Sequence, residues 1–172
     1  DIPGDSPFRL MDFQKEVERK MFDWSARARN DKDAVLSPGA VPNHPLTAPG
    51  QRMEDFCNCR LSKSLPQTGY FPGAVSAPLH ELLPPIVSER LRKAFPAVRI
   101  KNYFTNAALL LAVESRTSSP VRIPRDPETL EYVSMKGLYP CGEGAGYSGG
   151  IVSSATDGIR CALAAASQPS LE

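Results

Sequence analysis

The stretch GLYPCGEGAGYSGGIVSSATDGIRCALAA, residues 137–165, is the most informative part of this chain. Five of the nine residues from 142 to 150 are glycine, and an apolar pattern of helical period follows them. We expect a short strand to lead into the glycines and a helix to cover residues 149–166. The apolar positions of that helix are Ile151, Val152, Ala155, Ile159, Leu163 and Ala166. They predict that one face of this helix is apolar.

The glycines do not form a dinucleotide-binding fingerprint. Residues 144–149 match G-x-G-x-x-G, but that fingerprint requires a second strand with an acidic residue after the helix, and this chain holds no such strand. The local chemistry still favours a ligand. Glycines at 149 and 150 expose backbone N–H groups at a helix start, where an anion or an electron-rich ring edge binds well. Glu143 can accept hydrogen bonds from sugar or polyol hydroxyls. The alternative is a tight turn in which the glycines only permit close packing.

Upstream of this stretch, proline limits the length of regular elements. The chain has 17 Pro and 12 Gly among 172 residues. Apolar spacing predicts two helices, over residues 12–28 and 85–95. Loops are expected over residues 30–50 and 61–78, a strand or turn over 53–57, and strands over 98–100, 107–113, 130–133 and 137–139. These elements predict a loop-rich α+β protein.

The charge and cysteine content exclude several classes of function. There are 20 basic and 19 acidic side chains, so a net charge of +1 gives no field for nucleic acid or an anionic membrane. No apolar run is long enough for a transmembrane segment. Four cysteines are too few for a secreted disulfide scaffold, which favours a reduced compartment. A zinc site built from Cys57, Cys59, His44 and His80 is the weakest hypothesis, and we expect free thiols and no metal.

Two long motifs carry a resemblance to a known family. Residues 114–131 (ESRTSSPVRIPRDPETLE) and 137–160 (GLYPCGEGAGYSGGIVSSATDGIR) resemble the carboxyl-terminal part of the uncharacterised FAD-dependent dehydrogenases. These are two-domain flavoproteins of bacteria and plastids. Weaker similarity covers PLHELLPPIVSERLRKAFP, APGQRMEDF and DFQKEVERKMF. The resemblance therefore extends over most of the chain, with residues 30–45 as a departure or insertion.

The resemblance implies a divided fold. Residues 1–113 would be an inserted, substrate-type domain rich in proline, and residues 114–172 the returning half of an FAD-binding α/β domain with its late strands and final helix. The family binds the ADP half of FAD with an amino-terminal βαβ unit that this chain does not contain. The flavin site is thus expected to be incomplete without a partner or the missing half.

The resemblance also implies roles for particular residues. The cofactor-binding candidates are Gly142, Glu143, Gly144, Gly149, Gly150 and Ile151. Gly142 and Glu143 would lie near the ribityl and pyrophosphate groups of FAD, and Gly149, Gly150 and Ile151 near the pyrimidine edge of the flavin. The substrate-proximal candidates are Arg116, Thr117, Ser118 and Ser119. The alternatives are that Arg116 only pairs with Glu114 or Glu143 and that the serines only satisfy a turn. No catalytic acid or base is identified, because the flavin would supply most of the chemistry.

Two functions follow from the resemblance. In the first, the chain is the carboxyl-terminal portion of an FAD-dependent oxidoreductase, active only when the missing nucleotide-binding half completes it. In the second, it is a non-catalytic accessory subunit derived from such a flavoprotein and docked in a large organellar complex, for which a plastid is the first candidate. The expected location is a reduced compartment, either the chloroplast or the bacterial cytoplasm.

Overall fold

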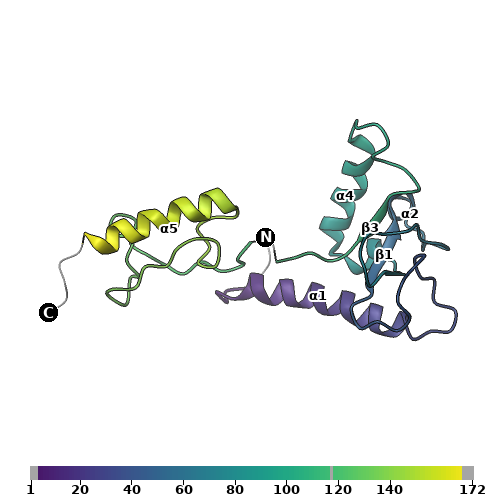
Figure 1. Cartoon of the computed structure of the whole chain (residues 1–172), viewed down its shortest axis with the longest axis horizontal. Coiled ribbons are helices and arrows are strands. Elements are labelled where there is room, and N and C mark those ends of the chain that lie inside the picture. Colours follow the sequence, from purple (N-terminus) through teal and green to yellow (C-terminus); the bar gives the residue numbers. More distant parts are fainter. Residues whose placement is uncertain (1–3, 117, 168–172) are drawn as a thin grey trace. The chain divides into compact units, whose positions relative to one another are not determined.

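A computed structural model describes residues 4–116 and 118–167 and confirms the loop-rich α+β class. The chain divides into two compact units (Figure 1). The core unit is Lys15–Val113, and the loop unit combines Asp1–Gln14 with Glu114–Glu172. The elements in chain order are α1 (Arg9–Ala28), β1 (Ala48–Arg52), α2 (Met53–Cys57), β2 (Ala74–Ser76), α3 (Leu79–Leu82), α4 (Pro85–Ala97), β3 (Leu109–Leu111) and α5 (Ile151–Ala166). The assignment of the two units to a substrate-type and a flavin-binding domain stays a prediction.

A three-stranded sheet forms the centre of the core unit. β1 lies in the middle, parallel to β2 and antiparallel to β3. The ladder with β3 begins where Gly50 faces Leu111. One residue earlier, the Ala112 N–H donates to the Pro49 carbonyl at 3.1 Å, and the reciprocal bond cannot form because proline has no N–H. Our prediction of a loop throughout residues 30–50 is therefore wrong at its end, where β1 begins and Pro49 closes the ladder.

The hydrophobic core of this unit lies between the helices and the sheet. Its buried members are Met21, Phe56, Ala77 and Leu79. The Phe56 ring is fully buried and meets the ring of Phe95 from α4 edge-on, with 5.8 Å between the ring centroids. Trp24 packs against the same cluster and donates its indole N–H to the Ser76 carbonyl at 3.3 Å. The core unit thus buries apolar side chains from four helices in one cluster.

The longer predicted elements of the core unit are confirmed, and the shortest ones are not. α1 and α4 cover the helices predicted over residues 12–28 and 85–95, and β3 lies in the strand predicted over residues 107–113. Residues 53–57 form α2 rather than a strand or turn, and β2 interrupts the predicted loop of residues 61–78. The prediction of a strand over residues 98–100 is wrong. A three-residue strand is too short to show a period in the sequence, so its pairing partner decides its conformation.

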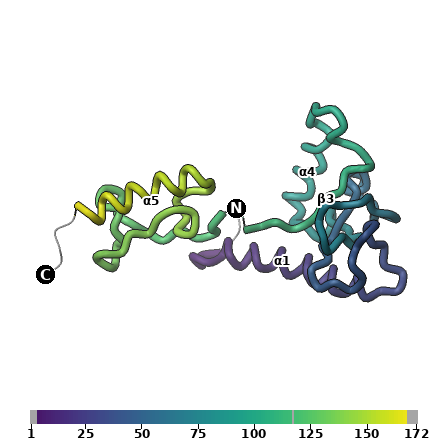
Figure 2. The backbone as a smooth tube through the Cα atoms, in the orientation of Figure 1, coloured from purple at the N-terminus to yellow at the C-terminus, as the bar shows by residue number. Residues whose placement is uncertain are grey.

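The loop unit consists of α5, residues 9–14 at the start of α1, and irregular chain. Figure 2 traces residues 118–150 as loops that run alongside α5. The described part of this unit has no regular strand, and its ladder contact is a single bridge between Arg125 and Tyr132. The predicted strands over residues 130–133 and 137–139 are therefore wrong, as is the strand expected to lead into the glycines. Local turns prevail instead: the Asp126 carboxylate accepts the backbone N–H groups of Glu128 and Thr129 at 2.9 and 2.8 Å.

The apolar face of α5 points outward. The helix forms as expected, and its buried residues are Asp157 and Cys161. The side chains of its apolar face are exposed: Ile151 by 91%, Val152 by 78%, Ile159 by 61% and Leu163 by 67%. The periodicity correctly predicted an amphipathic helix, but within the described chain the small and polar side faces inward. No helix in the described ranges has the length and apolar character needed to cross a membrane.

Candidate functional site

The glycine-rich loop is a compact turn between the irregular chain and α5. Its backbone closes on itself, because the Gly146 N–H donates to the Glu143 carbonyl at 2.9 Å and the Tyr147 N–H to the Gly142 carbonyl at 3.0 Å. Gly142 and Gly146 both have left-handed backbone angles, with φ of 69° and 82°. A Cβ on Gly146 would lie 2.5 Å from the Val121 carbonyl oxygen. The packing of the chain itself therefore requires glycine at position 146.

Three other glycines have no such requirement. A Cβ on Gly144 would meet no atom within 4 Å. A Cβ on Gly149 would come no closer than 3.4 Å to the Ser118 hydroxyl, and one on Gly150 no closer than 3.5 Å to the Ser153 hydroxyl. All three glycines are exposed. A side chain would fit at each position, so the described chain does not explain why none is there. Close approach of another molecule to the bare backbone would explain it.

The start of α5 presents unused hydrogen-bond donors. Gly150 caps the helix in an extended conformation, with φ of −153° and ψ of 162°, and provides no capping side chain. The N–H groups of a first helical turn have no acceptor within their helix, and the helix dipole makes this end positive. The nearby Glu143 is exposed, and its carboxylate makes no hydrogen bond or ion pair with any residue that the structure describes. The loop thus combines free donors with a free acceptor.

A buried ion pair holds this loop against α5. The Arg125 guanidinium donates to both carboxylate oxygens of Asp157, at 2.7 and 3.0 Å, and the side chains are only 7% and 10% exposed. Arg125 also donates to the Pro140 carbonyl at 2.7 Å and lies 3.7 Å from the centroid of the Tyr147 ring. Asp157 in turn accepts the Gly142 N–H at 2.9 Å. The pair therefore fixes both ends of the loop.

The environment of this pair keeps Asp157 charged. The hydrogen bonds from Arg125 and the Gly142 N–H outweigh the effect of burial and lower the Asp157 pKa to about 2. At the adjacent Cys161, burial outweighs the opposing charge of Arg125 and raises the pKa of the thiol. Sequence reasoning missed the pair because 32 residues separate its members. The feature of the sequence that could have indicated the pair is Asp157, which lies on the side of α5 opposite its apolar residues.

The structure brings together some of the predicted site residues. The Ser118 hydroxyl lies beside Gly149, so the two motifs that carried the family resemblance meet at the start of α5. Both backbone groups of Gly142 are engaged inside the chain. The Ser119 hydroxyl donates to the Val121 carbonyl at 2.8 Å, which is the turn role considered as its alternative. These positions leave the predicted cofactor and substrate contacts as predictions.

Two further candidates are placed less fully. Arg116 is exposed, and Thr117 lies outside the described residues. The two pairings considered for Arg116, with Glu114 or with Glu143, stay predictions. Within residues 4–116 and 118–167, no group of three or more His, Cys, Asp or Glu side chains is arranged to hold a metal ion.

Comparison with known proteins defines the class. Residues 1–117 match the family described as "FAD-dependent protein, C-terminal domain-like". The chain belongs to this family, which confirms the resemblance seen in its sequence. It is also 36% identical over 164 residues to an uncharacterised protein of Clostridium beijerinckii. That alignment covers 94% of this chain but only 28% of the relative. The family match ends before the glycine-rich loop, so the role of that loop depends on its geometry.

Proposed function

We propose that this chain is the carboxyl-terminal portion of an FAD-dependent oxidoreductase, and that its glycine-rich loop and the start of α5 contact the cofactor. The observation that carries the proposal is the pair Gly149 and Gly150. They leave an uncapped helix end open to close approach, although the chain has room for side chains there. Membership of a family described as FAD-dependent supports FAD as the ligand.

The residues present fit such a ligand. FAD, when bound, supplies hydride or electron transfer. The backbone N–H groups of Ile151 and Val152, in the first turn of α5, would donate to an electron-rich edge of the ring, and the helix dipole would favour negative charge there. The Glu143 carboxylate would accept hydrogen bonds from ribityl hydroxyls. Gly142 would act indirectly, by shaping the turn, because its own N–H is given to Asp157.

The exposed apolar side of α5 supports the need for another part. Ile159 and Leu163 are more than half exposed and carry no function that the described chain explains. The chain spans about 28% of the length of the curated relative that it matches, so that relative contains further chain outside the aligned part. We propose that a nucleotide-binding half, in the same or another polypeptide, packs on this side of α5 and binds the ADP portion of FAD.

Substitution of Gly150 by alanine tests the cofactor contact. A Cβ has room at this position in the chain, so Gly150→Ala should leave folding intact. If the bare backbone contacts FAD, the methyl group should greatly reduce the flavin that co-purifies with the natural assembly. Gly158→Ala is the matched control, because it lies within α5 and its Cβ would also meet no atom within 4 Å. The measurement is the ratio of flavin absorbance to chain in the purified assembly.

The carboxylate provides an independent test. Glu143→Gln removes the charge without breaking any contact with a described residue, and we expect a lower flavin content at unchanged melting temperature. Glu128→Gln, also exposed, is its control. If the natural assembly is colourless while the chain stays stably bound in it, the flavin proposal fails. That result would favour the accessory-subunit alternative, in which a large complex covers α5.

A further inference from the structure

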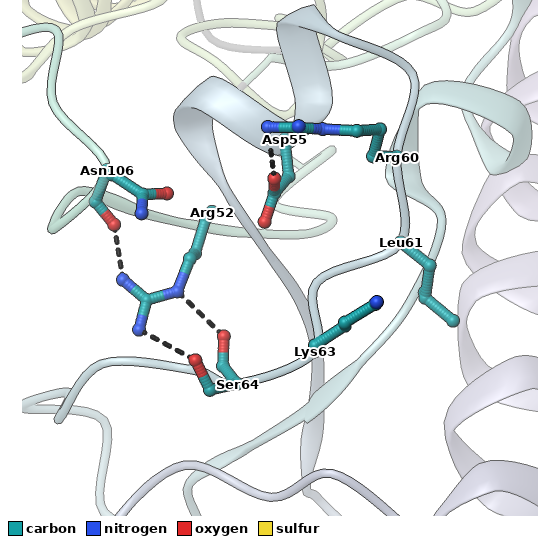
Figure 3. A pocket seen from close by; sticks show the side chains of 7 residues that line it. All are labelled: Arg52, Asp55, Arg60, Leu61, Lys63, Ser64 and Asn106. Atoms are coloured by element: carbon teal, nitrogen blue, oxygen red, sulfur yellow. Dashed lines mark hydrogen bonds and ion pairs between the residues drawn. The ribbon is translucent and has the colours of Figure 1, made fainter.

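A second site lies in the core unit, away from the glycine-rich loop. A cavity of about 630 Å³ opens where β1 passes into α2, and Figure 3 shows its walls. It is lined by Arg52, Asp55, Arg60, Leu61, Lys63, Ser64 and Asn106. The volume is within the range of about 300–1,000 Å³ that small-molecule sites occupy. The lining is unusual for such a site because six of the seven side chains are polar or charged.

Buried polar contacts fix the loop that forms one wall. The amide of the fully buried Gln51 donates to the Arg60 carbonyl at 2.7 Å. The buried Ser62 hydroxyl accepts the Arg52 N–H at 2.9 Å, and the Ser62 carbonyl accepts the Ser76 hydroxyl at 2.7 Å. These bonds connect residues 60–64 to β1 and β2 over several positions. The wall is therefore preorganised, which lowers the entropic cost of binding.

Positive charge dominates the cavity. It contains the cations of Arg52, Arg60 and Lys63 against the single carboxylate of Asp55. One oxygen of Asp55 faces the Arg60 guanidinium at 3.0 Å, and the other accepts the Ser62 hydroxyl at 2.9 Å. Figure 3 shows the Arg60 guanidinium over this carboxylate. Asp55 is thus engaged on both oxygens and offsets only one of the three cations.

The cations keep donors that the chain does not use. Arg52 donates from Nε to the Ser64 carbonyl at 2.7 Å, from Nη2 to the Ser64 hydroxyl at 3.1 Å and from Nη1 to the Asn106 carbonyl. Three of its five N–H groups are occupied, so two remain. The Lys63 ammonium is exposed and forms no hydrogen bond or ion pair with the described part of the chain. Arg52 is consequently held in place while both cations can still bind an anion.

We propose that this cavity binds the oxyanion group, carboxylate or phosphate, of a small polar molecule. Lys63 and the outer N–H groups of Arg60 would neutralise the oxyanion, and Arg52 would orient it. Charge-assisted hydrogen bonds of this kind are the strong ones, and the planar guanidinium fork matches both groups. Ser64 and Asn106 would serve the uncharged polar part of the ligand. The site lies wholly within the core unit and does not depend on flavin binding, so either proposal can fail without the other.

Titration of the whole chain tests this inference. Sodium phosphate and sodium succinate are added in separate experiments, with sodium chloride keeping the ionic strength constant, and binding is followed by backbone amide NMR shifts. We expect saturable shifts centred on residues 60–64 with at least one of the two probes. Lys63→Gln should weaken that binding about tenfold, since it removes one charge-assisted contact. It should not change folding, because Lys63 contacts no described partner.

Lys101→Gln is the control, because this exposed lysine of the core unit lies outside the cavity lining. It should bind like the unmodified chain. Saturation by phosphate alone would assign a phosphate group to the ligand, and saturation by succinate alone a carboxylate. The inference is overturned if neither probe saturates, if Lys63→Gln binds as tightly as the unmodified chain, or if Lys101→Gln weakens binding equally.

Discussion

Most of the buried apolar side chains of the described chain lie in the core unit, and few lie in the loop unit. The core unit encloses Phe56 and Leu79 in an apolar cluster. In the loop unit, the Arg125–Asp157 ion pair is buried between the loop and α5, while the apolar side chains of the helix are outside. The same chain thus contains one unit with a large apolar core and one that buries few apolar side chains, Leu130 among them, while those of its helix are exposed.

This difference teaches which unit can be stable by itself. Burial of apolar surface is the main source of folding free energy, and the core unit obtains it from its own residues. A buried ion pair adds little net stability, because removing the two charges from water offsets most of their attraction. The loop unit therefore gains less folding free energy from apolar burial than the core unit, and its structure depends more on the geometry of its ion pair and turns. We expect its stability to rise when another part covers α5.

The largest effect should come from the apolar core. Phe56→Ala should lower the free energy of unfolding of the core unit by about 4 kcal/mol, since it leaves a cavity under α4. Trp24 is the single tryptophan and packs against this core, so its fluorescence during urea unfolding reports on this unit. Phe71→Ala, at a side chain that is 79% exposed, should change the transition very little. Equal effects of the two substitutions would contradict the described core.

The next effect should come from the ion pair. Asp157→Asn removes one charge and leaves Arg125 buried without its partner, which should cost the loop unit about 3 kcal/mol. Amide hydrogen exchange should accelerate at residues 140–147, whose ends the pair holds. The Trp24 transition should stay where it is. If the midpoint of the Trp24 unfolding transition also shifts, the two units are not independent in stability. The contrast between a stable core unit and a dependent loop unit would then not hold.

Acid should weaken the loop unit in the same way. Asp157 has a pKa of about 2 in the folded protein against an ordinary value of 3.8. A folded-state pKa below the unfolded one means that the stabilisation is complete above about pH 4 and is lost as the pH falls towards 2. It amounts to about 2 kcal/mol. The protection factors of the amides of residues 140–147, which are their exchange rates corrected for the intrinsic effect of pH, should fall across this window more in the unmodified chain than in Asp157→Asn.

The smallest effect should come from the exposed side of α5. Ile159→Ser combined with Leu163→Ser should change the free energy of unfolding by less than about 1 kcal/mol, because both side chains are already in water. Urea unfolding followed by far-ultraviolet circular dichroism measures this change. The same pair should abolish binding of a part that packs on α5, as native mass spectrometry of the assembly would show. A large loss of stability in the chain alone would mean that α5 is buried after all.

The sequence predicted the long helices well because their periodicity is a property of the helix alone. The spacing of Val17 and Met21 located α1, and a proline at the first position located the start of α4. The spacing could not show which side of α5 faces inward. An apolar stripe indicates that something covers it, but not whether this chain supplies the cover. β1 was missed because Pro49 argued against a strand. Pro49 is tolerated here because it lies just beyond the last residue pair of the ladder between β1 and β3.

The candidate site was predicted in part. Residue types alone pointed to the glycines and to Glu143, and the structure separates Gly146, which packing requires, from Gly149 and Gly150, which it does not. The Arg125–Asp157 pair and the cavity beside Lys63 could not be predicted. Both depend on residues that are brought together only by the path of irregular chain, for which no sequence period exists.

Pro49 has a further consequence for how β1 and β3 find each other. A short strand such as Leu109–Leu111, with three identical side chains, has little in its own sequence to prevent slippage along a neighbour. Sliding it two residues further would place a leucine opposite Pro49, where the missing N–H would leave a carbonyl of β3 unpaired inside the sheet. Pro49 thus disfavours this particular slide of β3 along β1.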